Sequence, residues 1–118
     1  MRRATSVAAL ALLCAGAVAV PSGAADRPPS KKVKVADNFY SPKQLTVPEN
    51  TTIVWKWSRL NGETHDVFAA AKPKGVKRIW SVPAATHYTF KRKLKKAGKY
   101  RFICTFHEDM AMRVTVKR

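Results

Sequence analysis

The sequence is poor in acidic residues, in cysteine and in long apolar runs. It has 7 acidic residues against 23 basic ones, and 2 cysteines, among 118 residues. So few cysteines exclude a small scaffold held together by several disulfides. So few carboxylates leave a formal net charge of +16, which attracts anionic partners and repels cationic ones. The apolar run at residues 7–20 is shorter than the ~20 residues that a membrane-spanning helix needs.

The N-terminal segment has the order of a secretory signal. Arg2 and Arg3 precede the apolar residues 7–20, and the small residues 22–25 follow. A basic start, a short apolar run and a small-residue cleavage site predict a signal peptide over residues 1–25. We therefore expect an exported chain, either periplasmic or secreted.

The rest of the chain has the length of one domain. Residues 26–30 are polar and proline-rich and are expected to form a short leader, followed by a domain over residues 31–118. Removal of the signal peptide also removes Cys14 and leaves Cys104 alone. A lone cysteine in an oxidising compartment cannot form an internal disulfide, which favours a role as a metal ligand.

Short runs of alternating apolar and polar residues fill the domain, separated by proline, glycine and asparagine. This pattern is typical of a β-sandwich or barrel. No segment, including the lysine-rich residues 91–97, shows an apolar period of helical length, and we expect residues 91–97 to be a strand end and loop. The sequence therefore predicts an all-β sandwich of seven to eight strands. They are expected near residues 31–36, 43–47, 51–57, 65–70, 76–80, 86–91, 98–104 and 111–117.

Three potential metal ligands follow one another at the end of a predicted strand. Cys104, His107 and Met110 lie within seven residues, and His65 stands upstream. Thiolate, two imidazoles and a thioether form the donor set of a blue-copper site, in which sulfur suits Cu(I) and imidazole suits Cu(II). Zinc is the competing metal, but a thioether ligand argues against it. The spacing therefore predicts one mononuclear copper site.

Taken together, these features resemble the cupredoxins, the small blue-copper family that includes plastocyanin, pseudoazurin and amicyanin. The resemblance implies a Greek-key β-sandwich with one type 1 copper. By resemblance its ligands are His65, Cys104 and His107, with Met110 in the axial position; the spacing of the last three matches the short amicyanin-like loop. The residues that carry the resemblance are 37–42, 45–47, 51–55, 65–67, 88–90, 97–104 and 114–116.

Some details depart from the family pattern or leave an alternative open. Met112 competes with Met110 as axial ligand, although the residues after Met110 fit the family frame better and place Met112 where relatives have glycine. Asp66 replaces a common asparagine, so the support around the ligands is expected to be built differently. Glu108 and Asp109 lie on a face that is apolar in relatives, and they are expected to lower the reduction potential.

The resemblance implies a monomeric one-electron carrier rather than an enzyme, with His107 as the electron port. The basic surface is expected to dock a negatively charged redox protein or a membrane-associated oxidoreductase. A periplasmic copper-binding or delivery protein is the alternative. A third class is a cationic module for an anionic membrane surface; export from the cytoplasm disfavours nucleic acid as a partner.

Overall fold

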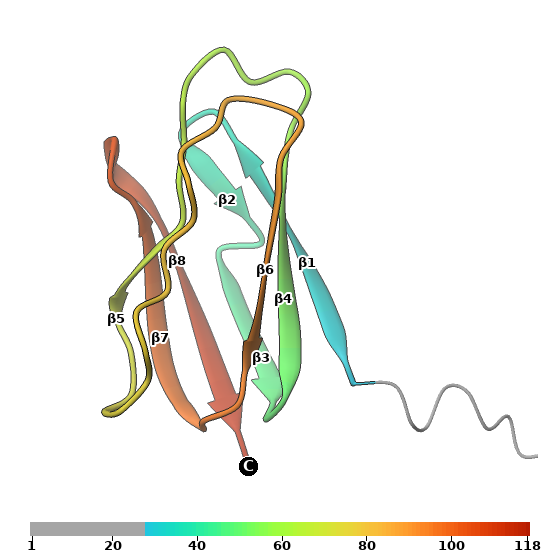
Figure 1. Cartoon of the computed structure of the whole chain (residues 1–118), viewed down its shortest axis with the longest axis vertical. Helices are drawn as coiled ribbons and strands as arrows, with labels where there is room; N and C mark the ends of the chain where they lie inside the picture. The colour runs from blue at the N-terminus through green and yellow to red at the C-terminus, as the bar shows by residue number, and fades with distance from the viewer. Residues whose placement is uncertain (1–27) are drawn as a thin grey trace, which may run out of the picture.

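The computed structural model describes residues 28–118, which form an eight-stranded sandwich (Figure 1). The predicted signal peptide and the first two residues of the leader lie outside the described residues. No helix suited to crossing a membrane occurs in the described part of the chain. The all-β prediction is confirmed. The strands are β1 (Ser30–Ala36), β2 (Phe39–Ser41), β3 (Gln44–Pro48), β4 (Thr51–Trp57), β5 (Phe68–Ala71), β6 (Thr89–Leu94), β7 (Gly98–Cys104) and β8 (His107–Lys117).

The strands form two four-stranded sheets that face each other. The first sheet has the order β2-β1-β4-β6 and the second the order β3-β8-β7-β5. β1 and β4 are parallel, as are β3 and β8, whereas the other neighbours are antiparallel. After β2 the chain crosses from one sheet to the other at each step up to β7, so both sheets depend on one shared core.

The core is built from the inward residues of these alternating strands. Trp55 of β4 packs against Phe90 and Phe102, with ring centroids 5.6 Å and 4.9 Å away. On β7 the inward residues are Tyr100, Phe102 and Cys104, all buried, as the alternation predicted. Cys104 therefore reaches one end of the sandwich on a strand whose position is fixed by aromatic packing.

Of the two strands predicted between residues 65 and 80, the first is confirmed with shifted bounds and the second is wrong. The segment predicted at residues 65–70 becomes strand only at Phe68, because the backbone of His65 pairs with Ala84 in an isolated bridge. The segment at residues 76–80 is not a strand, and only Trp80 makes an isolated bridge, to Phe68. Prolines at positions 73 and 83 flank that segment and lack the N–H that a regular ladder requires.

Three other boundaries also differ from the prediction. The strand expected at residues 86–91 is β6, which starts at Thr89, since His87 has a φ of 53° and breaks the extended backbone. Residues 91–94, expected as a strand end and loop, pair with β4 and bury Leu94. β8 begins at His107 rather than near residue 111, and the short β2 was not predicted. The β7–β8 turn lies at the end of the sandwich opposite the C-terminus (Figure 1).

Candidate metal centre

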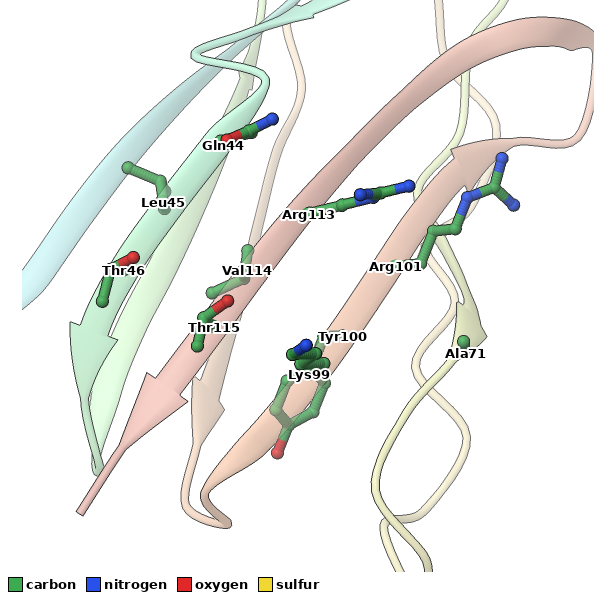
Figure 2. Close-up of a pocket in the computed structure, with 10 residues that line it drawn as sticks. All are labelled: Gln44, Leu45, Thr46, Ala71, Lys99, Tyr100, Arg101, Arg113, Val114 and Thr115. Carbon is green, nitrogen blue, oxygen red and sulfur yellow. The ribbon is translucent and has the colours of Figure 1, made fainter.

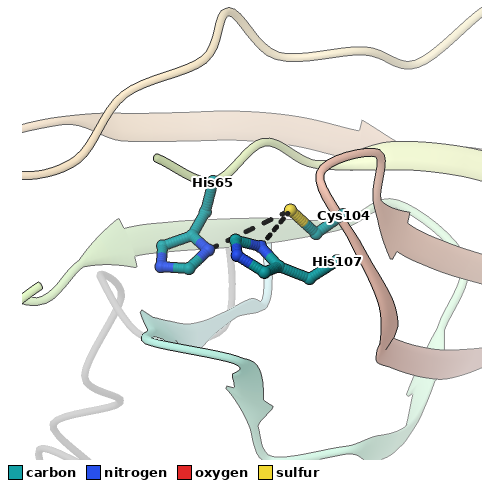
Figure 3. Close-up of side chains that lie close together, drawn as sticks. All are labelled: His65, Cys104 and His107. Carbon is teal, nitrogen blue, oxygen red and sulfur yellow. Dashed lines mark hydrogen bonds between the residues drawn. The ribbon is translucent and has the colours of Figure 1, made fainter. Parts of the chain in front are cut away.

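Three of the four predicted ligands meet at this end of the sandwich. Cys104 Sγ lies 3.5 Å from His107 Nδ1 and 4.0 Å from His65 Nδ1. Figure 3 shows both imidazole rings presenting a nitrogen to the sulfur. The three donor atoms all lie within 4.8 Å of one another, close enough for one ion to contact them all.

The β7–β8 hairpin sets the position of Cys104 and His107. These two residues are paired across the strands, and only Thr105 and Phe106 connect them. Burial raises the pKa of the Cys104 thiol, while nearby backbone N–H groups, those of Phe106 and His107 among them, oppose the rise. The folded chain thus holds a protonated thiol that has to lose its proton when a metal binds.

His65 is fixed on both sides of its ring and through its backbone. Its N–H and C=O pair with Ala84 at 2.9 Å and 3.0 Å, and its carbonyl accepts a hydrogen bond from Trp57 Nε1 at 3.2 Å. The imidazole is fully buried, and its Nε2 lies 2.8 Å from Asp37 Oδ1. A carboxylate next to Nε2 favours the tautomer with the proton there, which leaves the Nδ1 lone pair facing the sulfur.

Asp37 is itself held in place from the segment that precedes His65. Its carboxylate accepts hydrogen bonds from the backbone N–H groups of Gly62 at 2.9 Å and Glu63 at 3.2 Å. The Gly62 N–H first, and then the hydrogen bond with His65, hold the pKa of the Asp37 carboxyl below its ordinary value. The carboxylate is therefore ionised at neutral pH and serves as an acceptor for the His65 ring.

His107 is the ligand candidate nearest to solvent. Its side chain is 24% exposed, against 0% for His65, and its Nε2 lies 3.3 Å from Glu63 Oε2. The rings of His107 and His65 are tilted by 43° with centroids 4.8 Å apart. Of the three donor residues, His107 is thus the one whose side chain reaches solvent.

Asp66 ties together the segments that carry the ligands. Its buried carboxylate accepts hydrogen bonds from Thr105 N at 2.7 Å, Thr105 Oγ1 at 2.6 Å and Trp80 Nε1 at 2.9 Å. Its carbonyl accepts a bond from the Tyr40 hydroxyl at 2.5 Å. Asp66 follows His65 and Thr105 follows Cys104, so this carboxylate joins two ligand segments. Sequence reasoning identified Asp66 as an acceptor but missed Trp80 and Thr105.

The two methionines that compete for the axial position are both buried but differ in environment. Met112 Sδ accepts a hydrogen bond from Trp55 Nε1 at 3.3 Å, which occupies its sulfur inside the core. Met110 lies just beyond His107, where the β7–β8 register shifts after Ile103. The axial role of Met110 stays a prediction.

The comparisons with known proteins agree with this geometry. The sequence model of the cupredoxin-like domain matches residues 4–116. The chain belongs to this family. Among solved structures, a mutant of amicyanin in its reduced state is similar with a TM-score of 0.65 and 23% identity, over 84% of this chain and 87% of that one. No curated protein sequence matches the chain.

Two further similar structures extend the comparison. Another mutant of amicyanin, in its oxidised state, has a TM-score of 0.65 at 22% identity, over 75% of this chain and 82% of that one. The Cu-containing nitrite reductase of Thermus scotoductus SA-01 also has a TM-score of 0.65, at 23% identity and over 78% of this chain. This chain spans 23% of that reductase. At such identities the similarity shows the shared fold.

The donors of this cupredoxin-like domain fit a metal that binds both sulfur and nitrogen. One thiolate and two neutral imidazoles, preoriented and buried except for the partly exposed His107, satisfy the preference of copper in either oxidation state. Three protein ligands with an open position also occur in catalytic zinc sites. Most of the acidic residues lie around the site, in contact with the ligand segments or next to His107: Asp37, Glu63, Asp66, Glu108 and Asp109.

Proposed function

We propose that the mature chain is an extracytoplasmic blue-copper protein that carries single electrons through one type 1 copper site. His65, Cys104 and His107 are the strong ligands, and Met110 is the axial one. The observation that carries this proposal is that the Nδ1 atoms of His65 and His107 both face the buried Cys104 sulfur. Copper bound there supplies a centre that gains or loses one electron without breaking a bond in the protein.

The chain's own residues keep the donor geometry constant. Asp37 holds the His65 ring, and Asp66 joins the segment after His65 to the segment after Cys104. Burial raises the pKa of the Cys104 thiol, and the backbone N–H groups nearby offset part of that rise. A site that is prebuilt in this way needs little rearrangement when its charge changes, and little rearrangement favours fast electron transfer.

Export and partner choice belong to the same proposal. The sequence pattern of a signal peptide supports the location, and the net charge of +16 supports attraction to a negatively charged redox partner. The exposed edge of His107 would face that partner in a small, short-lived interface. Similar solved structures of amicyanin include reduced, oxidised and Cu(I) forms, which supports a carrier rather than an enzyme.

Electrochemistry separates a carrier from a copper-delivery protein. We expect a reversible one-electron wave, with copper retained in both oxidation states during repeated cycling. The same samples are then mixed with a Cu(I) chelator. Slow release, over hours, supports the carrier. Complete transfer to the chelator within seconds, or an irreversible wave with loss of copper, would contradict it and favour delivery.

A further inference from the structure

The outer face of the second sheet holds two arginines directly opposite each other. Arg101 of β7 and Arg113 of β8 are register partners in the antiparallel pair, and both are exposed. Like charges placed opposite each other across two strands destabilise the pair unless something offsets them. Figure 2 shows the two side chains on neighbouring strands.

Neither arginine has an anionic or aromatic partner in the described part of the chain. The ion pairs within 4 Å among residues 28–118 involve only His65 and His107 as cations. Two other arginines instead lie over aromatic rings, Arg78 above Trp80 and Arg92 above Phe90. The guanidinium groups of Arg101 and Arg113 therefore keep their donors available.

The arginine pair lies beside a surface hollow that is lined only by positively charged and uncharged residues. The hollow has a volume of about 290 Å³, and a second one of about 190 Å³ shares both arginines. No carboxylate of the described residues lines either of them. The polar side chains around the arginines come from β3, β7 and β8 and the residue before β3: Lys43, Gln44, Thr46, Lys99 and Thr115.

The strand register brings these groups into two adjacent rows. Gln44, Arg113 and Arg101 are aligned across β3, β8 and β7. Thr46, Thr115 and Lys99 form the next outward row on the same strands. Two guanidinium forks, an ammonium, two hydroxyls and an amide thus gather over one face, which matches the acceptors of a tetrahedral oxyanion.

We propose that the arginine pair, Arg101 and Arg113, binds a phosphate-type oxyanion on the outer face of the second sheet. The two guanidinium groups donate paired hydrogen bonds to its oxygens, and Lys99 and the hydroxyls of Thr46 and Thr115 complete the contacts. Neither His65, Cys104, His107 nor Met110 lines either hollow; Met112, the competing axial candidate, lines only the smaller one.

Two sources supply this chemistry, free phosphate and the headgroup of a phosphomonoester lipid. The test is a titration of the ¹⁵N-labelled mature chain with inorganic phosphate, at neutral pH and at an ionic strength held constant with chloride. A second arm measures sedimentation with vesicles of phosphatidylcholine, with and without phosphatidic acid. Both arms use the metal-free and the copper(I)-loaded protein, so failure of the copper proposal would leave this result readable.

Matched variants separate a site from general attraction. Arg101→Gln with Arg113→Gln is expected to weaken phosphate binding by about tenfold or more, since two charge-assisted contacts are lost. Lys56→Gln with Lys91→Gln removes the same charge from the outer face of the first sheet. This control is expected to keep the affinity within about twofold, because screening limits distant charges.

Replacing the pair by lysines tests the forked geometry. Arg101→Lys with Arg113→Lys keeps the charge but is expected to weaken binding several-fold, since lysine cannot bind two oxygens at once. Arginine-dependent binding to phosphate identifies a free oxyanion, and binding only to phosphatidic acid identifies the headgroup; both support the site. The proposal would be overturned by the absence of saturable binding in both arms. It would also be overturned if the Lys56→Gln, Lys91→Gln control lost as much affinity as the double arginine-to-glutamine variant, or if the double arginine-to-lysine variant bound as tightly as the wild type.

Discussion

The buried ring of His65 joins Asp37 to Cys104: Nε2 lies 2.8 Å from the Asp37 carboxylate and Nδ1 lies 4.0 Å from the Cys104 sulfur. Asp37 comes from the turn between β1 and β2, whereas Cys104 ends β7. One imidazole thus connects the two sheets at the metal end, and its orientation depends on a carboxylate that is no ligand itself.

Asp37→Ala is expected to weaken metal binding by about 10- to 100-fold, because the His65 ring loses the partner that fixes its tautomer. Competition with a chelator for Cu(II) measures the change. Asp37→Asn retains an acceptor oxygen and should recover most of the affinity. Glu49→Ala removes a carboxylate from the turn between β3 and β4 and should leave the affinity unchanged. Equal affinities in wild type and Asp37→Ala would show that His65 needs no such support.

Asp66→Ala is expected to lower the free energy of unfolding by about 2–3 kcal/mol, since three donors lose a buried charged acceptor. Denaturant unfolding of the metal-free protein measures this loss. Asp109→Ala removes an exposed carboxylate and should change stability by less than about 0.5 kcal/mol. A similar small change for Asp66→Ala would mean that the link between the ligand segments contributes little.

Two leucine variants test which methionine, Met110 or Met112, is the axial ligand. Met110→Leu is expected to alter the visible spectrum and the reduction potential of the copper protein, because the thioether ligand is lost. Met112→Leu should leave both unchanged and cost less than about 1.5 kcal/mol of stability, since its sulfur contacts Trp55 in the core. The reverse pattern would assign the axial position to Met112.

The metal-free protein is expected to lose stability in alkali. Burial raises the pKa of Cys104 above 9.0 and the pKa values of Tyr40 and Tyr100 above 10.0. The folded state therefore holds these protons more tightly than the unfolded chain. The stability they contribute is complete below pH 9 and is lost as the pH rises through the folded pKa values.

Thermal unfolding between neutral pH and about pH 11 measures this loss as a fall in Tm that begins near pH 9. Tyr40→Phe and Cys104→Ala each remove one of the acids and should flatten the slope, whatever their effect on Tm at neutral pH. A Tm in the wild-type protein that stays constant over this whole range would contradict the expectation.

The local part of the site could be read from the sequence, but the distant part could not. Alternation along residues 98–104 points Cys104 inward, and the short spacing to His107 brings both residues into one hairpin. Asp37 is 28 residues from His65, and no pattern in the sequence brings the two together. The sequence pattern predicts a strand that ends at Trp80, yet this segment is irregular and brings the Trp80 indole N–H to Asp66.

The strand errors have the same origin. In β4 and β7 the residues alternate between buried and more exposed positions, as the alternation of apolar and polar residues in the sequence predicts. Around His65 the backbone instead makes one isolated bridge, to Ala84, which holds the His65 ring at the site. The residues there therefore do not form a continuous strand ladder, although their sequence alternates. The predicted strand stops at Lys91, because the lysines that follow give no apolar alternation; Lys93 occupies an outward position of β6, while Leu94 faces the core.

The visible absorption spectrum of the mature chain with Cu(II), recorded beside a Cys104→Ala variant, tests the central claim most directly. We predict an intense thiolate-to-copper band that ascorbate bleaches and air or ferricyanide restores, and that the variant lacks. A weakly coloured protein, a band that survives in Cys104→Ala, or equal retention of zinc and copper in competition would contradict a redox-active copper site.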